Sequence, residues 1–541
     1  MRTAILLGFI LVAGVSCKKD DIDLDKISNT VSWNPKVAVP VGYGDFSVKD
    51  FYEAEDDSSG LIKEYPDNML YLAYRTQLLS KVAEQIILIP NQSIQEIILA
   101  GDAGFPVFGA SNTISYTRNS SYSFAFVNHE EMDSMYIKAG TLLLNLSSTF
   151  HNTGNIRLTM PSLKRNGVPL QIDINITSST GTFTYNAPRD LSGYKLYFPK
   201  TTADPNAIPL VYEATLNKSG TSVTSTDKIT VNTQILQFKF QQIFGYISTY
   251  NFINYSDKIE MDLFNVDKAA VIDFSDPHVN IYIKNSCGVP FQFSITNTRT
   301  YNEPTNSYFP VNLTPNTKMI RYPTYNEIGK TKYDTLAYNN ATSNFKAALQ
   351  TTPKYLYYSI AALSNPPALG KQKNFLQDTS KIGVDLEIEL PFNLRSKRLA
   401  IIDSMDFDLS GIVNDYAILK KLILHNKFEN GLPFDLSYQL FLTDENYNII
   451  DSVFRVNQQP ILPSGVVGSD GKVTSSSNKE LQIEFTGDRI LNFKRVKKAI
   501  YKLTLNTYND GQTYVKFYST DRLKVWFGVQ ADLEVHSLDQ I

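Results

Sequence analysis

The chain has 541 residues, a net charge of −3 at pH 7 and 19% charged residues. This length exceeds what a single hydrophobic core supports and predicts about three or four domains. The charge provides neither the basic field that nucleic acid requires nor a polybasic stripe for anionic lipid, so we expect no nucleic-acid partner.

The first element in chain order is a secretion signal. Arg2 gives it a basic start, residues 5–14 form an apolar run, and Val15 and Ser16 precede Cys17. The run is much shorter than the roughly 20 apolar residues that span a bilayer, which predicts cleavage rather than a membrane-spanning helix.

Residues 14–17, Gly-Val-Ser-Cys, resemble the lipobox of bacterial lipoproteins, although Gly14 stands where a bulky apolar residue is commoner. The resemblance implies that residues 1–16 are a signal peptide that is removed, and that Cys17 is acylated on its thiol and its amine. Several acyl chains bind membrane lipid firmly, at about 0.8 kcal/mol per buried methylene, whereas one chain binds only marginally. The alternative is an ordinary secreted protein in which Cys17 has no special role.

Residues 17–30 are predicted to be the acylated cysteine and a charged tether. Lys18, Lys19, Asp20 and Asp21 resemble the lysine-plus-acidic export signal of surface lipoproteins in the Bacteroidota. The resemblance implies a protein anchored in the outer membrane that faces the cell exterior. The alternative is a solvated tether, because charged linkers repel themselves and remain extended.

Residues 31–110 are predicted to form an N-terminal β region. Strands are expected at 37–41 and 93–99, and the mixed spacing of 77–87 leaves a short helix open. The acidic residues 53–57 could hold a cation, but a solvated loop is the simpler interpretation. We therefore expect no metal and no cofactor.

The remaining chain has the composition of an all-β protein. The full chain contains 32 Tyr and 31 Phe but only 2 Trp, with few helical periodicities. Apolar residues occupy every second position from Leu170 to Ile176, from Ile382 to Leu390 and from Leu523 to Val535. Such alternation predicts half-buried strands of antiparallel sheets.

A Gly-x-Pro pattern recurs at Gly167, Gly288 and Gly431, each between two candidate strands and 121 and 143 residues apart. Glycine permits a tight connection and proline fixes the start of a strand. Residues 383–388 also resemble 528–535, and both segments are expected to be closing strands. We therefore predict tandem antiparallel β-sandwiches at 111–250, 251–395 and 396–541. The asparagine-bearing turns weakly resemble late-embryogenesis-abundant-type domains, which implies a sandwich fold and no function.

Catalytic motifs are sparse, and we expect no enzyme. The five histidines have no metal-ligand spacing, and the chain contains neither a nucleophile elbow nor a phosphate-binding loop. The run His129-Glu130-Glu131 is interpreted as an exposed turn, and Cys287 as a small buried hydrophobe. Two distant carboxylates converging in a cleft, as in a polysaccharide hydrolase, stay open.

Three functions follow from these patterns. The preferred one is a non-catalytic surface module that binds or scaffolds another protein, such as an outer-membrane protein. The alternative is glycan binding through the tyrosines of residues 322–325 and 355–358, because aromatic faces stack on sugars. A hydrolase is the third.

Overall fold

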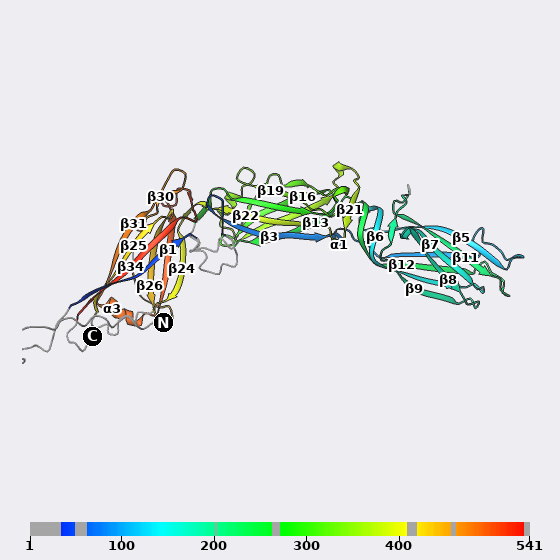
Figure 1. Cartoon of the computed structure of the whole chain (residues 1–541), viewed down its shortest axis with the longest axis horizontal. Coiled ribbons are helices and arrows are strands. Elements are labelled where there is room, and N and C mark those ends of the chain that lie inside the picture. Colours follow the sequence, from blue (N-terminus) through cyan, green and yellow to red (C-terminus); the bar gives the residue numbers. More distant parts are fainter. Residues whose placement is uncertain are drawn as a thin grey trace, which may run out of the picture.

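The computed structural model describes residues 34–48, 62–200, 203–261, 271–407, 419–455 and 461–534. The predicted all-β class is confirmed, because nearly every regular element is an antiparallel strand. The strands form three β-sandwiches that lie in a row (Figure 1). We call them proximal, middle and distal, and the proximal one contains both the first and the last described strand.

The proximal sandwich consists of two sheets. The first has the strand order β1 (Lys36–Ser47), β34 (Arg522–Leu533), β25 (Leu419–Asn430) and β31 (Ser477–Thr486). The second has the order β24 (Leu399–Asp406), β32 (Lys498–Thr507), β26 (Phe434–Thr443) and β27 (Ile449–Ser452), with β28 (Ile461–Leu462) also on β26. Helix α3 (Asp488–Asn492), the turn η7 (Phe493–Arg495) and the small pair β29 (Val466–Val467) and β30 (Val473–Ser475) complete it.

The middle sandwich has the same construction. Its first sheet has the order β2 (Ile62–Glu64), β3 (Leu70–Val82), β22 (Lys381–Pro391), β15 (His278–Asn285) and β19 (Lys332–Tyr338). Its second has the order β13 (Asn251–Glu260), β20 (Tyr355–Ser364), β16 (Phe291–Asn302) and β17 (Ser307–Pro310), with β18 (Thr317–Ile320) also on β16. Short helical elements are α2 (Phe345–Leu349), η4 (Tyr325–Glu327) and η5 (Pro367–Leu369).

The distal sandwich is one sheet folded into two layers. One layer has the order β4 (Gln92–Leu99), β12 (Lys228–Tyr246), β6 (Glu131–Ser148) and β9 (Phe183–Asp190). The other has the order β5 (Thr113–Ser123), β11 (Ala207–Asn217), β7 (Gly154–Arg165) and β8 (Val168–Ile176). Strand β10 (Lys195–Tyr197) pairs with both β6 and β7 and joins the layers.

The three sandwiches therefore share one eight-strand topology. Apart from the short strand β2, which the middle sandwich adds at the edge of β3, the first strand of each lies beside the last (β1 on β34, β3 on β22, β4 on β12), and the strand second in order belongs to the opposite sheet. The sandwiches are nested rather than tandem. The distal one follows strand β3 of the middle one, and the middle one follows strand β1 of the proximal one.

This nesting differs from the predicted N-terminal β region at 31–110, which does not form a unit of its own. Its strands β1, β3 and β4 belong to three different sandwiches, and each pairs with the closing strand of its sandwich. The physical reason is that an edge strand needs only one neighbour to satisfy one row of its backbone hydrogen bonds. The short helix left open within 77–87 is α1 (Ala83–Ile86), which connects β3 to β4.

The two joints between sandwiches are built alike. At the distal–middle joint, β21 (Asn374–Gln377) pairs with the end of β12, which pairs with the start of β6. At the middle–proximal joint, β33 (Val515–Lys516) pairs with β23 (Asn393–Lys397), which pairs with β14 (Val271–Phe274). Both joints thus consist of paired strands rather than a flexible linker: β21 extends the distal sheet at the first joint, and the second joint is a small three-stranded sheet.

A charged network reinforces the middle–proximal joint. The Asp273 carboxylate is only 3% exposed, and it lies 2.9 Å from Arg395 Nη2 and accepts a hydrogen bond of 2.5 Å from the Tyr514 hydroxyl. Lys346 of α2 approaches the same carboxylate at 3.9 Å. A buried charge is tolerated only when it is paired and hydrogen-bonded, so this contact holds the two sandwiches in one arrangement.

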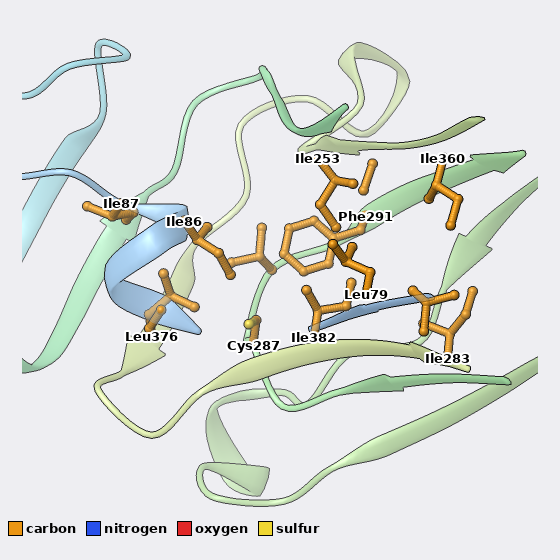
Figure 2. Packing of buried hydrophobic residues seen from close by; sticks show 14 of the residues in the cluster. Leu79, Ile86, Ile87, Ile253, Ile283, Cys287, Phe291, Ile360, Leu376 and Ile382 are labelled. Atoms are coloured by element: carbon orange, nitrogen blue, oxygen red, sulfur yellow. The ribbon is translucent and has the colours of Figure 1, made fainter. Parts of the chain in front are cut away.

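The hydrophobic core extends through both joints. One cluster of buried side chains runs from the distal sandwich through the middle one into the adjoining end of the proximal one. A second cluster fills the rest of the proximal sandwich. Figure 2 shows Cys287 among Leu376, Ile382 and the helix residue Ile86 near the distal–middle joint. Cys287 is fully buried, as predicted, and burial raises the pKa of its thiol well above the ordinary value.

Two of the three Gly-x-Pro segments are equivalent in the structure. Gly288 and Gly431 lie where the chain crosses between the two sheets, from β15 to β16 and from β25 to β26. Gly167 instead lies in the hairpin of β7 and β8, so the prediction that it belongs to the same repeat was wrong. A hairpin and a crossover both need a tight turn, which is why the local sequence is the same.

Buried side chains hold the crossovers. Asn285 accepts a hydrogen bond from the Cys287 N–H at 2.9 Å, and Asn430 accepts one from the Leu432 N–H at 2.9 Å. In the distal sandwich the equivalent contact runs from the Phe150 N–H to the Ser148 hydroxyl at 3.3 Å. Residues 383–388 and the part of their sequence echo at 528–533 also lie on equivalent strands, β22 and β34, both of which close their sandwiches.

Candidate binding surfaces

The predicted processing residues Cys17, Lys18, Lys19, Asp20 and Asp21 lie outside the described residues. The first described segment nevertheless locates the attachment of the chain that precedes it. Strand β1 begins beside the end of β34, with Lys36 opposite Asp532, at the outer end of the proximal sandwich. Any anchor upstream of Asn34 therefore connects to this end of the row (Figure 1).

The opposite end of the row carries four loops, which we call the tip loops: residues 100–112, 149–153, 177–182 and 218–227. Hydrogen bonds connect them. Asn152 Nδ2 donates to the Ser219 hydroxyl at 3.2 Å, His151 Nδ1 lies 3.2 Å from the Ser179 carbonyl, and Lys218 Nζ donates to the Gly109 carbonyl at 3.1 Å. The loops thus form one continuous surface at the end of the distal sandwich.

The tip loops are rich in hydroxyl groups and poor in charge. Their sequences include Thr-Ser-Ser-Thr-Gly-Thr at 177–182 and Ser-Gly-Thr-Ser-Val-Thr-Ser-Thr at 219–226. In loop 100–112 the Phe105 ring packs 5.8 Å from Phe150, while Val107 is 86% exposed. Short hydroxyl side chains on a rigid frame, around an exposed apolar residue, suit binding of a partner surface better than chemistry.

A second surface is the tyrosine cluster on the outer face of the middle sandwich, formed by Tyr301, Tyr308, Tyr355 and Tyr357. Ring centroids lie 5.0 Å apart for Tyr301 and Tyr308 and 5.8 Å apart for Tyr308 and Tyr357. Lys258 Nζ lies 3.7 Å above the Tyr355 ring. The cluster gathers tyrosines from β16, β17 and β20, but the sequence indicated only those of β20.

Cationic side chains of the same chain already contact the faces of these rings. The Arg299 guanidinium lies 4.5 Å from the Tyr308 centroid and 5.6 Å from the Tyr357 centroid. Neither Arg299 nor Lys258 forms an ion pair within the described part of the chain, and both are held by the aromatic rings instead. The surface therefore offers hydroxyl groups and two cations more than open ring faces.

The other tyrosine segment serves the fold. The Tyr325 hydroxyl donates to the Asn374 carbonyl at 3.0 Å, and its ring stacks 5.7 Å from Phe244 across the distal–middle joint. Burial raises the pKa of Tyr325 to about 12. This residue is a joint contact rather than a sugar platform.

Carboxylates line the outer face of β22. Catalysis by a pair of carboxylic acids would need two of them without structural partners. Asp385 lies 2.9 Å from Lys284 Nζ and 3.5 Å from Arg75 Nη2. Glu387 accepts a hydrogen bond of 2.6 Å from Tyr282, and burial raises the pKa of that phenol to about 12. These two carboxylates thus have structural partners and give the hydrolase hypothesis no support.

The structure partly corrects the interpretation of the run His129-Glu130-Glu131 as an exposed turn. His129 is exposed, but Glu130 is fully buried and accepts a hydrogen bond from the Asn128 N–H at 2.9 Å. The carboxylate closes a turn before β6, which the polar character of the run did not indicate. Within the described ranges, no group of three His, Cys, Asp or Glu side chains gathers to hold a metal ion.

Comparisons with known proteins identify no family. No protein-family model matches the chain, and no curated protein is significantly similar to it. Among solved structures, the chain is similar to a protein of Parabacteroides distasonis that is named as secreted, with 13% identity, a TM-score of 0.28, and coverage of 54% of this chain and 89% of the other. A structure of infectious bursal disease virus gives 8% identity, a TM-score of 0.13, and coverage of 84% and 81%.

No helix in the described residues is long and apolar enough to cross a bilayer.

Proposed function

We propose that this protein is a non-catalytic lipoprotein of the cell surface, which binds or scaffolds a partner protein. It is anchored in the outer membrane through acylated Cys17 and faces the exterior. The observation that carries the proposal is that the start of the described chain and the tip loops lie at opposite ends of the row of sandwiches. The chain enters at the outer end of the proximal sandwich, and the tip loops lie at the far end of the distal one.

The joints explain why this separation matters. Because both joints consist of paired strands and the core continues through them, the sandwiches form a stiff spacer. A stiff spacer keeps the tip loops away from the membrane and holds them in a fixed arrangement. Loops held by a rigid frame lose less entropy when they bind.

The anchor is tested by labelling cells with radioactive palmitate. The native chain is expected to incorporate label, and the Cys17→Ser variant to incorporate none. Trypsin added to intact cells is expected to cut the chain together with a known surface protein. An unlabelled native chain contradicts the anchor, and a chain that resists trypsin while the surface protein is cut contradicts surface exposure.

The binding role is tested by purifying the tagged protein from gently solubilised outer membranes and identifying stoichiometric companions by mass spectrometry. Replacing residues 219–226 by alternating Gly and Ser is expected to release a companion that binds the tip loops. The matched control replaces Asn166 and Gly167, a hairpin elsewhere on the same sandwich. A companion that survives the first change and is lost with the second contradicts a role for the tip.

Glycan binding is a second candidate, favoured by one observation, the four tyrosines gathered on one outer face. A polysaccharide gel-shift panel tests it, with Tyr308→Ala as the variant, since Tyr308 is 52% exposed. Retardation that Tyr308→Ala abolishes supports glycan binding. Equal migration in all polysaccharides excludes it for that panel.

A further inference from the structure

The middle and proximal sandwiches each have an end that we call the base, where the first strand starts and the last strand ends. One backbone contact defines it in both. In the middle sandwich the Phe392 N–H donates to the Leu70 carbonyl at 2.8 Å, and in the proximal one the Leu533 N–H donates to the Pro35 carbonyl at 3.0 Å. By this register, Val37 of β1 is equivalent to Leu72 of β3.

The base of the middle sandwich is covered by protein. The Leu70 N–H donates to the Phe517 carbonyl of the proximal sandwich at 2.9 Å. Strand β2 pairs antiparallel with β3, which places Ile62 opposite Leu72. As a result Leu70 is fully buried and Leu72 is 9% exposed.

The helix at this base is covered as well. Phe345 and Leu349 of α2 are each 1% exposed, and Lys346 donates to the Tyr514 hydroxyl of the proximal sandwich at 3.0 Å. Strand β3 and helix α2 of the middle base therefore both contact a neighbouring element of the chain. The cover consists of one short antiparallel strand and the end of the next sandwich.

The base of the proximal sandwich is open among the described residues. Val37 is 46% exposed and Val39 is 53% exposed, although both are paired with β34 on one side. In α3, the helix equivalent to α2, Ile490 is only 2% exposed, whereas Leu491 beside it is 53% exposed. The free side of β1 has no neighbouring strand in the part of the chain that the structure describes.

The edge of β1 is blocked at only two points. Exposed edges are normally blocked by charged side chains, proline or bulges; β1 has Lys36 at its start, and Pro40 with a register shift between Pro40 and Gly42, which leaves the uncharged stretch 37–39 between them. Strand β4, at the equivalent edge of the distal sandwich, is shielded differently. Its Glu96 side chain contacts Arg118 at 3.2 Å and Ser120 at 2.7 Å on β5.

The charges around the proximal base favour a protein over an anionic lipid surface. A basic run, residues 494–498 (Lys-Arg-Val-Lys-Lys), lies here. Exposed Asp406, Glu445 and Asp488 surround the same end and offset it. An apolar centre with balanced charges at its rim is the composition of a protein interface.

We propose that the proximal base is a third joint, at which a separate protein adds an extended segment antiparallel to β1. The segment occupies the position that β2 has on β3, and its alternate apolar side chains cover Val37 and Val39. This inference rests on the proposed function, because an anchor at this end places the partner at the membrane, as expected for an outer-membrane protein. Strand addition of this kind draws affinity from backbone hydrogen bonds and specificity from alternate side chains.

The test uses the full chain in its own cells, with the photo-cross-linking residue p-benzoylphenylalanine at position 39. The same residue at position 168 is the matched control, because Val168 is 66% exposed on the distal sandwich. One cross-linked protein is expected from position 39 and none of that size from position 168. Adding Val37→Lys is expected to reduce the cross-link at least tenfold, whereas Val168→Lys leaves it unchanged.

Mass spectrometry of the cross-linked peptide decides the mode of binding. An extended partner segment with apolar residues at alternate positions supports the inference. Cross-linking to lipid, to a second copy of this chain or to a helical segment overturns it, as does a cross-link that Val37→Lys leaves intact. Palmitate labelling of the same cells separates the two proposals, because a labelled chain without the cross-link overturns only this inference.

Discussion

The middle and proximal sandwiches follow the same strand order, but they differ in how well their bases are buried. Leu72 on β3 is 9% exposed, and the equivalent Val37 on β1 is 46% exposed. The pairing partners are equivalent too, since each first strand lies beside the last strand of its sandwich. Topology therefore does not determine burial. Position in the row does, because the middle sandwich has a neighbour at its base and the proximal one has none among the described residues.

The comparison also separates two kinds of stabilisation. Backbone pairing and the buried asparagine of the crossover are the same in both sandwiches, so they define the fold. Apolar burial differs along the row and defines where each sandwich contacts something else. A fold repeated three times thus keeps its hydrogen bonds and varies its contact surfaces.

The largest expected effect comes from removing one aromatic ring from each of the two sandwiches, a buried ring from the middle one and an exposed ring from the proximal one. Phe291→Ala deletes a fully buried ring of the middle core and is expected to lower the free energy of unfolding by about 3–5 kcal/mol. Phe527→Ala in the proximal sandwich deletes a ring that is 44% exposed and is expected to cost about 1 kcal/mol.

Urea unfolding measures both losses, and hydrogen exchange of β16 and β34 assigns each loss to its sandwich. Equal losses for the two variants contradict the difference in burial on which the comparison rests.

The crossover asparagines are expected to behave alike. Asn285→Ala and Asn430→Ala each leave a buried N–H and a buried carbonyl without their partner, because Asn285 Nδ2 donates to Arg321 and Asn430 Nδ2 to Phe434. Each change is expected to cost about 2–3 kcal/mol. Asn175→Ala on the exposed face of β8 is the control and is expected to change stability by less than about 0.5 kcal/mol. Urea midpoints that differ widely between the two crossover variants contradict their equivalence.

The turn before the closing strand contains a carboxyl group, Asp521, in the proximal sandwich and a neutral hydroxyl group, Ser380, in the middle one. The Asp521 carboxylate accepts the Tyr518 N–H at 2.9 Å, and in the middle sandwich the Ser380 hydroxyl accepts the Gln377 N–H at 3.0 Å. Burial raises the pKa of Asp521 from 3.8 to about 6. Because the folded carboxyl group holds its proton more tightly than the unfolded one, stability is lost as the pH rises from about 4 to 6.

Asp521→Ser gives the proximal turn the neutral group of the middle one. The variant is expected to lose this pH dependence and to gain up to about 3 kcal/mol at pH 7, since each pKa unit represents about 1.4 kcal/mol. Urea unfolding of both proteins at pH 4, 5, 6 and 7 measures the difference. Parallel stability profiles show that Asp521 is ionised in the fold at low pH and contradict the raised pKa.

The strands themselves were predictable because alternation is a local signal. The predicted inward residues Leu170, Ile172, Ile174 and Ile176 are all at most 7% exposed, as are the five from Ile382 to Leu390. The same alternation from Leu523 is buried at Leu523 and Val525 but not at Phe527. The pattern identifies the face of a strand, whereas burial depends on what lies opposite.

The nesting and the open base were not predictable from local pattern. Lys36 lies opposite Asp532 and Val82 opposite Lys381, and no feature of a short segment indicates a partner so far along the chain. The tip loops had a weak signal, the Ser- and Thr-rich segments 177–182 and 219–226. The open edge had one too, the nearly uncharged residues 36–40. Both became meaningful only when the sheet order showed which ends were free.

The smallest expected effect is the most direct check on the open base. Val37→Ala in the purified chain is expected to cost less than about 0.5 kcal/mol, because half of the side chain already contacts water. The equivalent Leu72→Ala is expected to cost about 2–3 kcal/mol, since Leu72 is buried and lies beside Ile62 of β2. Urea unfolding under identical conditions compares them. A loss above about 1 kcal/mol for Val37→Ala means that this chain covers its own base, which leaves no free edge for a partner strand.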